Sequence, residues 1–255
     1  MELDPRLRKI TDSQPYPLVF ATVSGAHLYG FASADSDWDL RGVHVLPIEE
    51  VAGLNDREET IEDSPEVTSD GFELDLVTHD IEKFMRLMLK RNGYVLEQVF
   101  SPLIVATTPE HEKLKALAKD CITRHHAHHY LGFARTQWGL FLKDTPRKVK
   151  PLLYVYRVLF TGIHLMRTGR IEANINTLNE ELRLPYVGDL VSRKVNGKEK
   201  EELADDDFDF HRSEYERLVR LLEDERDRSG LPDQPSVRAT LNDLLLRVRL
   251  SGLSR

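Results

Sequence analysis

Two aspartates within the stretch SGAHLYGFASADSDWDLRGV, residues 24–43, have the spacing of a metal-binding pair. Asp37 and Asp39 lie two residues apart at the expected start of a strand, so their side chains point to the same face. Carboxylates that close repel each other unless a cation lies between them. Hard oxygen ligands suit Mg²⁺, which prefers a few carboxylates together with phosphate oxygens, and Mn²⁺ is the alternative ion. The pair therefore predicts a site for a divalent metal.

A third carboxylate on a neighbouring strand would allow two ions to share this site. Asp75 is the best candidate, because its strand could lie beside the strand that begins at Asp39, and Glu73 is the reserve. Two ions held in this way clamp the attacking and leaving oxygens of a phosphoryl displacement. Asp37, Asp39 and Asp75 are therefore predicted to be both the catalytic and the metal-binding residues.

An aspartate pair of this kind is not specific to one chemistry. An Asp-x-Asp sequence also occurs in glycosyltransferases that hold a sugar nucleotide through Mn²⁺. It arises by chance in turns and caps as well, where Asp37 would cap a turn and Asp39 would be solvated. Arg41 follows the pair and is expected to point to the opposite face of the sheet, so it is left out of the predicted site.

The residues just before the aspartates are suited to hold a phosphate group. Gly25 lets backbone amides approach an anion closely, and the turn after it directs N–H groups towards phosphate. Ser24 and Ser36 could add hydroxyl donors. The stretch therefore indicates a phosphate-binding turn, a spacer and then a pair of metal ligands.

Apolar patterning predicts the elements that carry these residues. Strands are expected at 16–24, 39–47 and 71–80. Residues 48–70 are acidic and weakly periodic, which predicts a surface connection. Thr78 is the expected N-cap of a helix that ends at Gly93, and a short helix follows at 94–100.

From residue 109 onward the pattern is helical almost throughout. Helices are expected at 110–122, 127–142, 152–168, 212–227 and 237–250. Residues 196–209 are dense in charge, which predicts an exposed segment. The chain therefore divides into an α/β N-terminal part and an all-helical C-terminal part, with a boundary near residues 102–110.

The composition favours a cytoplasmic protein that does not enter a membrane. The net charge is −8, and the single cysteine, Cys121, fits a reducing compartment. No apolar run approaches the length that spans a bilayer, and the charged N-terminus lacks the apolar stretch of a secretory signal.

Positive charge is concentrated in one region of the chain. Nine Lys or Arg residues accompany one acid, Asp144, between residues 122 and 170. Such a region attracts a polyanion such as a nucleotide or an RNA end, although a solvated face balanced by acids elsewhere is the alternative. Lys150, Tyr154 and Arg157 share one helix face. They would close over a nucleotide, or Tyr154 would lie in the core with the cations snorkelling around it.

Three histidines would share a face at the start of a helix, namely His125, His128 and His129. Their spacing could bind a transition metal. No Cys or carboxylate lies at a matching spacing nearby, so a polar or RNA-facing helix start is the preferred interpretation.

The opening stretch resembles the signature of the DNA polymerase β-like nucleotidyltransferases, a Gly-Ser or Gly-Gly followed by Asp-x-Asp. It is more similar to the predicted nucleotidyltransferases associated with RNA ligases, which read Gly-Ser-x-x-Tyr-Gly and then Ser-Asp-x-Asp-x-x-Gly-Val. The matching positions are Gly25, Tyr29, Gly30, Ser36, Asp37, Asp39, Gly42 and Val43, and farther on Lys90, Asn92 and Glu97. The resemblance extends through the helical segments to about Ile171.

This resemblance implies an α/β (α+β) fold with a small mixed-sheet nucleotidyltransferase domain, residues 1–105, followed by a helical domain, residues 106–255. It implies a Mg²⁺-dependent enzyme that moves a nucleoside monophosphate from an NTP such as ATP to a hydroxyl, with release of pyrophosphate. An RNA 3′ end is the favoured acceptor, with RNA-repair enzymes as partners. A protein hydroxyl or a small molecule such as an aminoglycoside is the alternative.

One position departs from the family pattern. Ala26 stands where the family usually has serine, so a hydroxyl that would touch the phosphates is missing. The backbone amide of Ala26 remains, and the predicted nucleotide-binding residues are Ser24, Gly25, Ala26, Ser36, Lys150, Tyr154 and Arg157. The departure also keeps open a non-catalytic module of the same fold that binds nucleotide or RNA.

Overall fold

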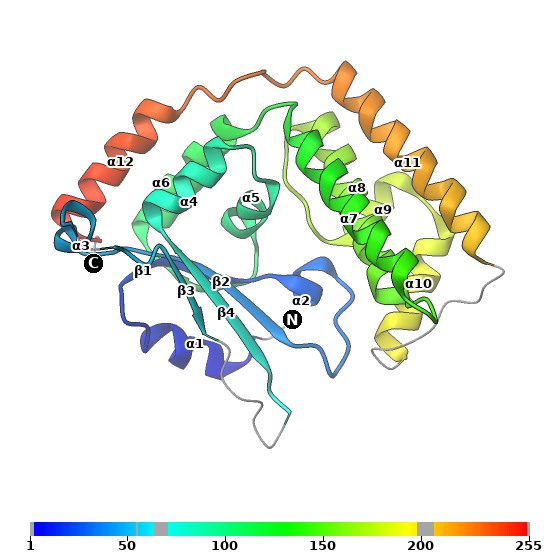
Figure 1. The fold of residues 1–255 in the computed structure, drawn as a ribbon, viewed down its shortest axis with the longest axis horizontal. Coiled ribbons are helices and arrows are strands. Elements are labelled where there is room, and N and C mark those ends of the chain that lie inside the picture. Colours follow the sequence, from blue (N-terminus) through cyan, green and yellow to red (C-terminus); the bar gives the residue numbers. More distant parts are fainter. Residues whose placement is uncertain (1–2, 55, 64–70, 198–206, 254–255) are drawn as a thin grey trace. The chain divides into compact units, whose positions relative to one another are not determined.

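A computed structural model describes residues 3–54, 56–63, 71–197 and 207–253 (Figure 1). The described residues form a five-stranded sheet in the order β3-β4-β2-β1-β5. Its strands are β1 (Leu18–Val23), β2 (Trp38–His44), β3 (Thr60–Asp63), β4 (Leu74–Asp80) and β5 (Ile104–Thr107). The pair β2–β4 is parallel and the other pairs are antiparallel, so the sheet is mixed. Together with the helices, this sheet confirms the expected α/β class.

The helices make up most of the remaining chain. They are α1 (Pro5–Asp12), α2 (Gly25–Tyr29), α3 (Ile48–Ala52), α4 (Ile81–Leu89), α5 (Gly93–Phe100), α6 (Pro109–Ala118), α7 (His126–Lys143), α8 (Val149–Thr168), α9 (Ile175–Leu182), α10 (Pro185–Asn196), α11 (Phe208–Arg228) and α12 (Arg238–Ser251). Within the described residues, no helix is both long enough and apolar enough to cross a membrane.

The chain divides into two compact units that are interleaved along the sequence. The sheet unit comprises Met1–Gly25, Asp37–Cys121 and Gln234–Arg255, and the helical unit comprises Ala26–Ser36 and Ile122–Asp233. The expected domains, 1–105 and 106–255, stay a prediction, since compactness does not test whether either part folds by itself.

Successive side chains of β2 and β4 point to opposite faces of the sheet, and this alternation determines which residues enter the core of the sheet unit. Leu40 and Leu76 are fully buried in one apolar cluster with Leu7 of α1. Helix α1 covers this face of the sheet, and α4, α5 and α6 lie on the other side (Figure 1). The aspartates that alternate with these leucines therefore face away from the α1 side.

The helical unit is built around α8. Leu153, Val155 and Leu159 are among its many fully buried side chains, so this helix is apolar almost all round. Gly162 lets a neighbouring helix approach, because a Cβ there would lie 2.8 Å from the Leu222 side chain of α11.

Three expectations about local structure are wrong. Residues 48–70 are not only a surface connection, since α3 and the edge strand β3 lie within them. The N-cap of α4 is Asp80, whose side chain accepts a hydrogen bond from the Glu82 amide, and not Thr78, which is a residue of β4. Helix α1 and strand β5 were not expected at all.

Most of the charge-dense segment 196–209 lies outside the described residues.

Candidate metal and nucleotide site

Asp39 and Asp75 are direct neighbours on the parallel strands β2 and β4. The register pairs Asp39 with Asp75, and both side chains face the same side of the sheet. One guanidinium nitrogen, Nη2 of Arg41, donates to Oδ1 of Asp39 at 2.9 Å and to Oδ2 of Asp75 at 2.7 Å. The two carboxylates are therefore held around a single cationic group.

The position of Arg41 corrects the expectation that it points to the opposite face. Residues 39 and 41 are two apart on one strand, so their side chains share a face. The guanidinium is anchored by donating to the Tyr94 hydroxyl at 2.9 Å and to the backbone oxygens of Leu40 and Asp75 at 3.0 and 2.6 Å. Burial alone would lower the pKa of Arg41, but Tyr94 and the two carboxylates raise it above its ordinary value.

Gly25 lies directly against the carboxylate of Asp39. A Cβ at position 25 would be 1.7 Å from Oδ2 of Asp39, and the backbone φ of +59° disfavours any side chain there. The amide of Ser24 donates to the backbone oxygen of Asp39 at 2.8 Å, which fixes the bend beside the strand. The glycine turn and the strand that carries Asp39 are thus adjacent, as the phosphate-binding prediction requires.

The hydroxyl of Ser24 is fully buried and has no hydrogen-bond partner among the described residues. A buried hydroxyl without a partner is unfavourable, so this atom is suited to bind a water molecule or a ligand oxygen. Ala26, the next residue after the glycine, is buried and contributes only its backbone to this turn.

Asp37 precedes β2 and is half-buried. Within the described ranges its side chain makes no hydrogen bond or ion pair. Glu73, the reserve candidate, is exposed, and its backbone oxygen accepts from the Trp38 amide at 2.9 Å.

Across the part of the chain that the structure describes, no three His, Cys, Asp or Glu side chains are grouped closely enough to hold a metal ion. The structure brings Asp39 and Asp75 together and does not gather Asp37 with them.

The donor chemistry at this position nevertheless fits a hard divalent cation. Two carboxylates share one face, a third lies on the segment that leads into β2, and a buried hydroxyl adjoins the glycine turn. Carboxylate and hydroxyl oxygens are the ligands that Mg²⁺ and Mn²⁺ prefer. An ion that binds there must share the two strand carboxylates with the guanidinium of Arg41.

The three predicted nucleotide-binding residues on α8 belong to the helical unit. Arg157 is 2% exposed, and its guanidinium lies 3.8 Å above the ring of Tyr29. Tyr154 packs edge-on against Tyr29 and Phe31, with ring centroids 5.6 and 5.4 Å apart. Lys150 is half-buried. Tyr154 is half-buried and Arg157 is buried on an aromatic ring, so Arg157 does not snorkel around a core tyrosine, and the nucleotide role of these residues stays a prediction.

A known protein family matches nearly the whole chain. Residues 2–247 match the model of the RlaP family, described as an RNA repair pathway DNA polymerase beta family. The chain belongs to the RlaP family. This description confirms the expected DNA polymerase β-like family over nearly the whole sequence.

Similar proteins span the same length as this RlaP chain. The uncharacterized protein MJ0002 of Methanocaldococcus jannaschii is 29% identical, covering 91% of this chain and 94% of its own. The uncharacterized protein YcgL of Bacillus subtilis is 26% identical, covering 94% and 92%. A solved nucleotidyltransferase-like protein from Exiguobacterium sibiricum aligns at 12% identity over 96% of this chain and 73% of that chain. Its TM-score of 0.32 is too low to support any argument.

In this RlaP chain, residues after 172 support the loop that leads to Asp37. The side chain of Asn176 donates to the backbone oxygen of Gly30 at 2.7 Å. Gly30 has a φ of +84°, and a Cβ there would lie 2.4 Å from Oδ1 of Asn174. The signature glycine is thus required by a contact inside the helical unit that the local sequence pattern does not reveal.

Ser36, a predicted nucleotide ligand, is also held within the helical unit. Its hydroxyl accepts from the Ser33 amide at 3.0 Å, and the Ser33 hydroxyl accepts from Nζ of the buried Lys194 at 2.6 Å. These contacts order the loop just before Asp37, and the role of Ser36 towards a nucleotide stays a prediction.

Three of the nine Lys or Arg residues between 122 and 170 make their contacts inside the helical unit. Arg124 pairs with Asp233 at 2.6 Å, and Arg147 stacks at 4.1 Å over the ring of Phe208. Arg167 pairs with carboxylates of α9 and α11 at 2.8 and 2.7 Å. These paired cations favour the balanced-surface alternative over a continuous basic face.

The histidine-rich start of α7 shows no metal site in the described residues. His125 lies 3.1 Å from a carboxylate oxygen of Asp233, and its ring stacks on that of His128. Burial, with a contribution from Arg157, lowers the pKa of His129 to about 4, so this ring is neutral at pH 7.

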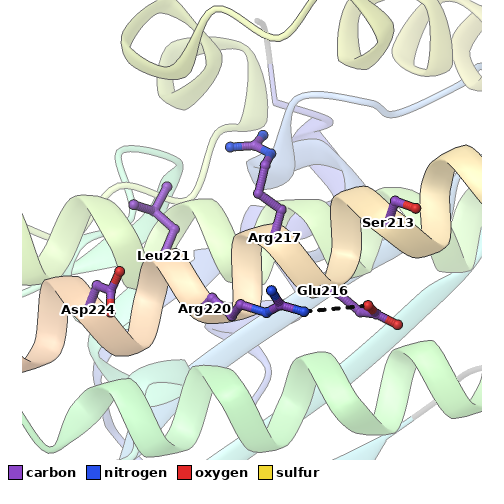
Figure 2. Close-up of a pocket in the computed structure, with 6 residues that line it drawn as sticks. All are labelled: Ser213, Glu216, Arg217, Arg220, Leu221 and Asp224. Atoms are coloured by element: carbon purple, nitrogen blue, oxygen red, sulfur yellow. Dashed lines mark ion pairs between the residues drawn. The ribbon is translucent and has the colours of Figure 1, made fainter.

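A pocket of about 460 Å³ lies on α11, and none of the predicted site residues lines it (Figure 2). It is lined by Ser213, Glu216, Arg217, Arg220, Leu221 and Asp224. Figure 2 shows these side chains along one helix, with Arg220 directed at Glu216, 3.8 Å away. Its lining carries both signs of charge, two arginines and two carboxylates.

Proposed function

We propose that this chain is a metal-dependent nucleotidyltransferase that moves a nucleoside monophosphate from an NTP to a hydroxyl acceptor. The observation that carries the proposal is the in-register pair Asp39–Asp75, with the Asp39 carboxylate against the Gly25 turn. A carboxylate pair supplies ligands for Mg²⁺ or Mn²⁺, and the turn next to it supplies amides for a triphosphate.

The residues act in the proposed reaction as follows. When bound, the divalent ions neutralise the triphosphate and make the acceptor hydroxyl easier to deprotonate. Asp37 and Asp39 would hold the ions, and Asp75 would help to hold the catalytic ion and would accept the proton of the acceptor hydroxyl. The hydroxyl oxygen bonds to the α-phosphorus while the bond from that phosphorus to the bridging oxygen breaks, which releases pyrophosphate. The Ser24 hydroxyl and the amides around Gly25 bind the phosphates.

We favour an RNA 3′ end as the acceptor, because the family is described by an RNA repair pathway. RNA-repair enzymes then follow as partners, and ATP is the first nucleotide to test. A cytoplasmic location also stays a prediction. Cys121 is a buried free thiol, which fits that expectation.

The proposal is tested by transfer of label from α-³²P NTPs to pools of RNA in the presence of Mg²⁺. RNA with a free 3′ hydroxyl should be labelled, and RNA with a blocked 3′ end should not. Asp39→Asn and Asp75→Asn should each lower the rate by about 100-fold or more, because each removes a metal ligand. Asp63→Asn, on the exposed end of β3, is the matched control and should retain the rate. Transfer that survives both substitutions in the strand pair would remove the proposed reaction.

A second candidate is a module of the same fold that binds nucleotide or RNA without turnover. Two observations favour it: alanine replaces the usual serine at position 26, and Arg41 lies between the strand carboxylates. The same assay separates the two candidates. Nucleotide binding without transfer to any RNA, protein or aminoglycoside acceptor would support the second.

A further inference from the structure

Arg41 provides a positive charge at the place where the proposed reaction needs a metal ion. Its Nη2 bridges Asp39 and Asp75 at 2.9 and 2.7 Å, and its side chain is only 10% exposed. The neighbouring strands place the two carboxylates side by side, where they would repel each other without a cation. The guanidinium therefore offsets one of the two negative charges of this pair.

The guanidinium is held in place by groups other than the carboxylates. Nε donates to the Tyr94 hydroxyl, and Nη1 donates to two backbone oxygens. Tyr94 is itself fixed at the start of α5, where its amide donates to the side chain of Asn92 at 3.0 Å. Because three of these hydrogen bonds involve no carboxylate, the guanidinium stays when an ion enters beside it.

We infer that Arg41 suppresses the binding of free divalent ions at Asp39 and Asp75, so that the metal binds together with the nucleotide. A fixed positive charge within a few ångströms of both ligands repels an incoming cation. The negative charge of a triphosphate offsets that repulsion. The inference rests on the proposed function, and it assigns the order in which the metal and the nucleotide bind.

The experiment measures Mn²⁺ binding without any nucleotide, by the electron paramagnetic resonance signal of the free ion. The wild-type protein should bind Mn²⁺ weakly. Arg41→Gln should bind it about tenfold more tightly or better, because the repelling charge is gone. Arg41→Lys keeps the charge and should stay within about twofold of the wild type. An unchanged or weaker affinity in Arg41→Gln would overturn the inference, and so would a tenfold gain in Arg41→Lys.

Two control variants connect the signal to this site. Arg86→Gln removes an exposed arginine elsewhere in the sheet unit and should leave Mn²⁺ binding unchanged. Adding Asp75→Asn to Arg41→Gln should abolish the gain, and a gain that persists would mean that the ion binds elsewhere. If Arg41→Gln does not fold, Arg41→Met removes the same charge with a side chain of similar length and should give a gain in the same direction. No gain in Arg41→Met would then overturn the inference.

A titration with a non-hydrolysable NTP analogue separates this inference from the proposed function. If the wild type binds Mn²⁺ with the analogue and Arg41→Gln shows no gain alone, only the role of Arg41 is lost. If neither protein binds Mn²⁺ even with the analogue, the proposed function itself fails.

Discussion

A methyl group at position 25 and the carboxylate of Asp39 would occupy the same space. The glycine is therefore required by sterics as well as by its positive φ, before any role in phosphate binding. The signature glycine and the second aspartate of the signature thus constrain each other, although 14 positions separate them in the sequence.

We expect Gly25→Ala to lower the free energy of unfolding by about 2–4 kcal/mol, from overlap with Asp39 and from backbone strain. Urea denaturation followed by circular dichroism measures it. In an Asp39→Gly background, which also removes the Cβ of residue 39 that lies 3.0 Å from the added atom, the same substitution should cost only the strain, about 1–2 kcal/mol. Gly139→Ala is the control, because a Cβ there meets nothing within 4 Å and an alanine inside a helix is slightly stabilising. Equal effects at positions 25 and 139 would contradict the steric argument.

At the residue scale, strand patterns in the sequence indicate which carboxylates share a face, but they do not indicate which side chains from other elements contact them. The expected neighbouring strand places Asp75 next to Asp39, as the register has it, whereas the Asp-x-Asp spacing predicts Asp37 beside Asp39 and the structure does not gather Asp37 with them. The side-chain period of a strand also puts Arg41 on the face of Asp39, so its position could have been derived from the sequence. Tyr94 could not, because its contact with Arg41 depends on how α5 lies against the sheet, which no local pattern encodes.

At the element scale, the parallel pair β2–β4 buries a histidine. Nδ1 of His44 lies 2.8 Å from the Thr78 hydroxyl of the neighbouring strand, and the ring is 1% exposed. Burial lowers the pKa of His44 to about 4, against about 6.5 in an unfolded chain. Between these values the unfolded chain binds more protons than the folded one, so stability falls as the pH falls.

We therefore expect the free energy of unfolding to decrease between pH 7 and pH 4, with His44 contributing up to about 3 kcal/mol. His44→Gln should flatten this part of the profile, measured by urea denaturation at several pH values. The slope should not vanish, because His79 and His129 also have a pKa of about 4. His164→Gln, at a half-buried position beside Glu181, is the comparison. A profile equally steep in both variants would exclude the assignment to His44.

The elements themselves could be predicted where one face is buried. Strands β1, β2 and β4 are expected because apolar residues recur along them. Strands β3 and β5 have four residues each, none of them fully buried, so their patterns resemble those of loops. Short strands of this kind form because a neighbouring strand supplies hydrogen bonds, and that neighbour is distant in the sequence.

At the scale of the whole molecule, the last helix completes the first unit. Arg249 of α12 has a buried side chain, which pairs with the buried carboxylate of Asp80, the N-cap of α4. It also donates to the backbone oxygen of Leu46 at 2.7 Å. A boundary placed near residue 105 separates these partners, because composition changes there although the contacts of the sheet unit continue to the C-terminal helix.

Replacing Arg249 by methionine should lower the free energy of unfolding by about 3 kcal/mol or more, because Asp80 is left buried without its cation. Thermal or urea denaturation measures the loss. Arg247→Met changes an exposed arginine on the same helix and should shift stability by less than about 0.5 kcal/mol. A comparable loss in both variants would show that helix α12, and not the buried ion pair, carries the effect.

The pairing of Asp80 with Arg249 also has a consequence for synthesis. On the ribosome, Asp80 is made 169 residues before its partner, so the nascent sheet unit carries an unneutralised core carboxylate while those residues are added. Full closure of the unit must therefore wait until α12 has been synthesised.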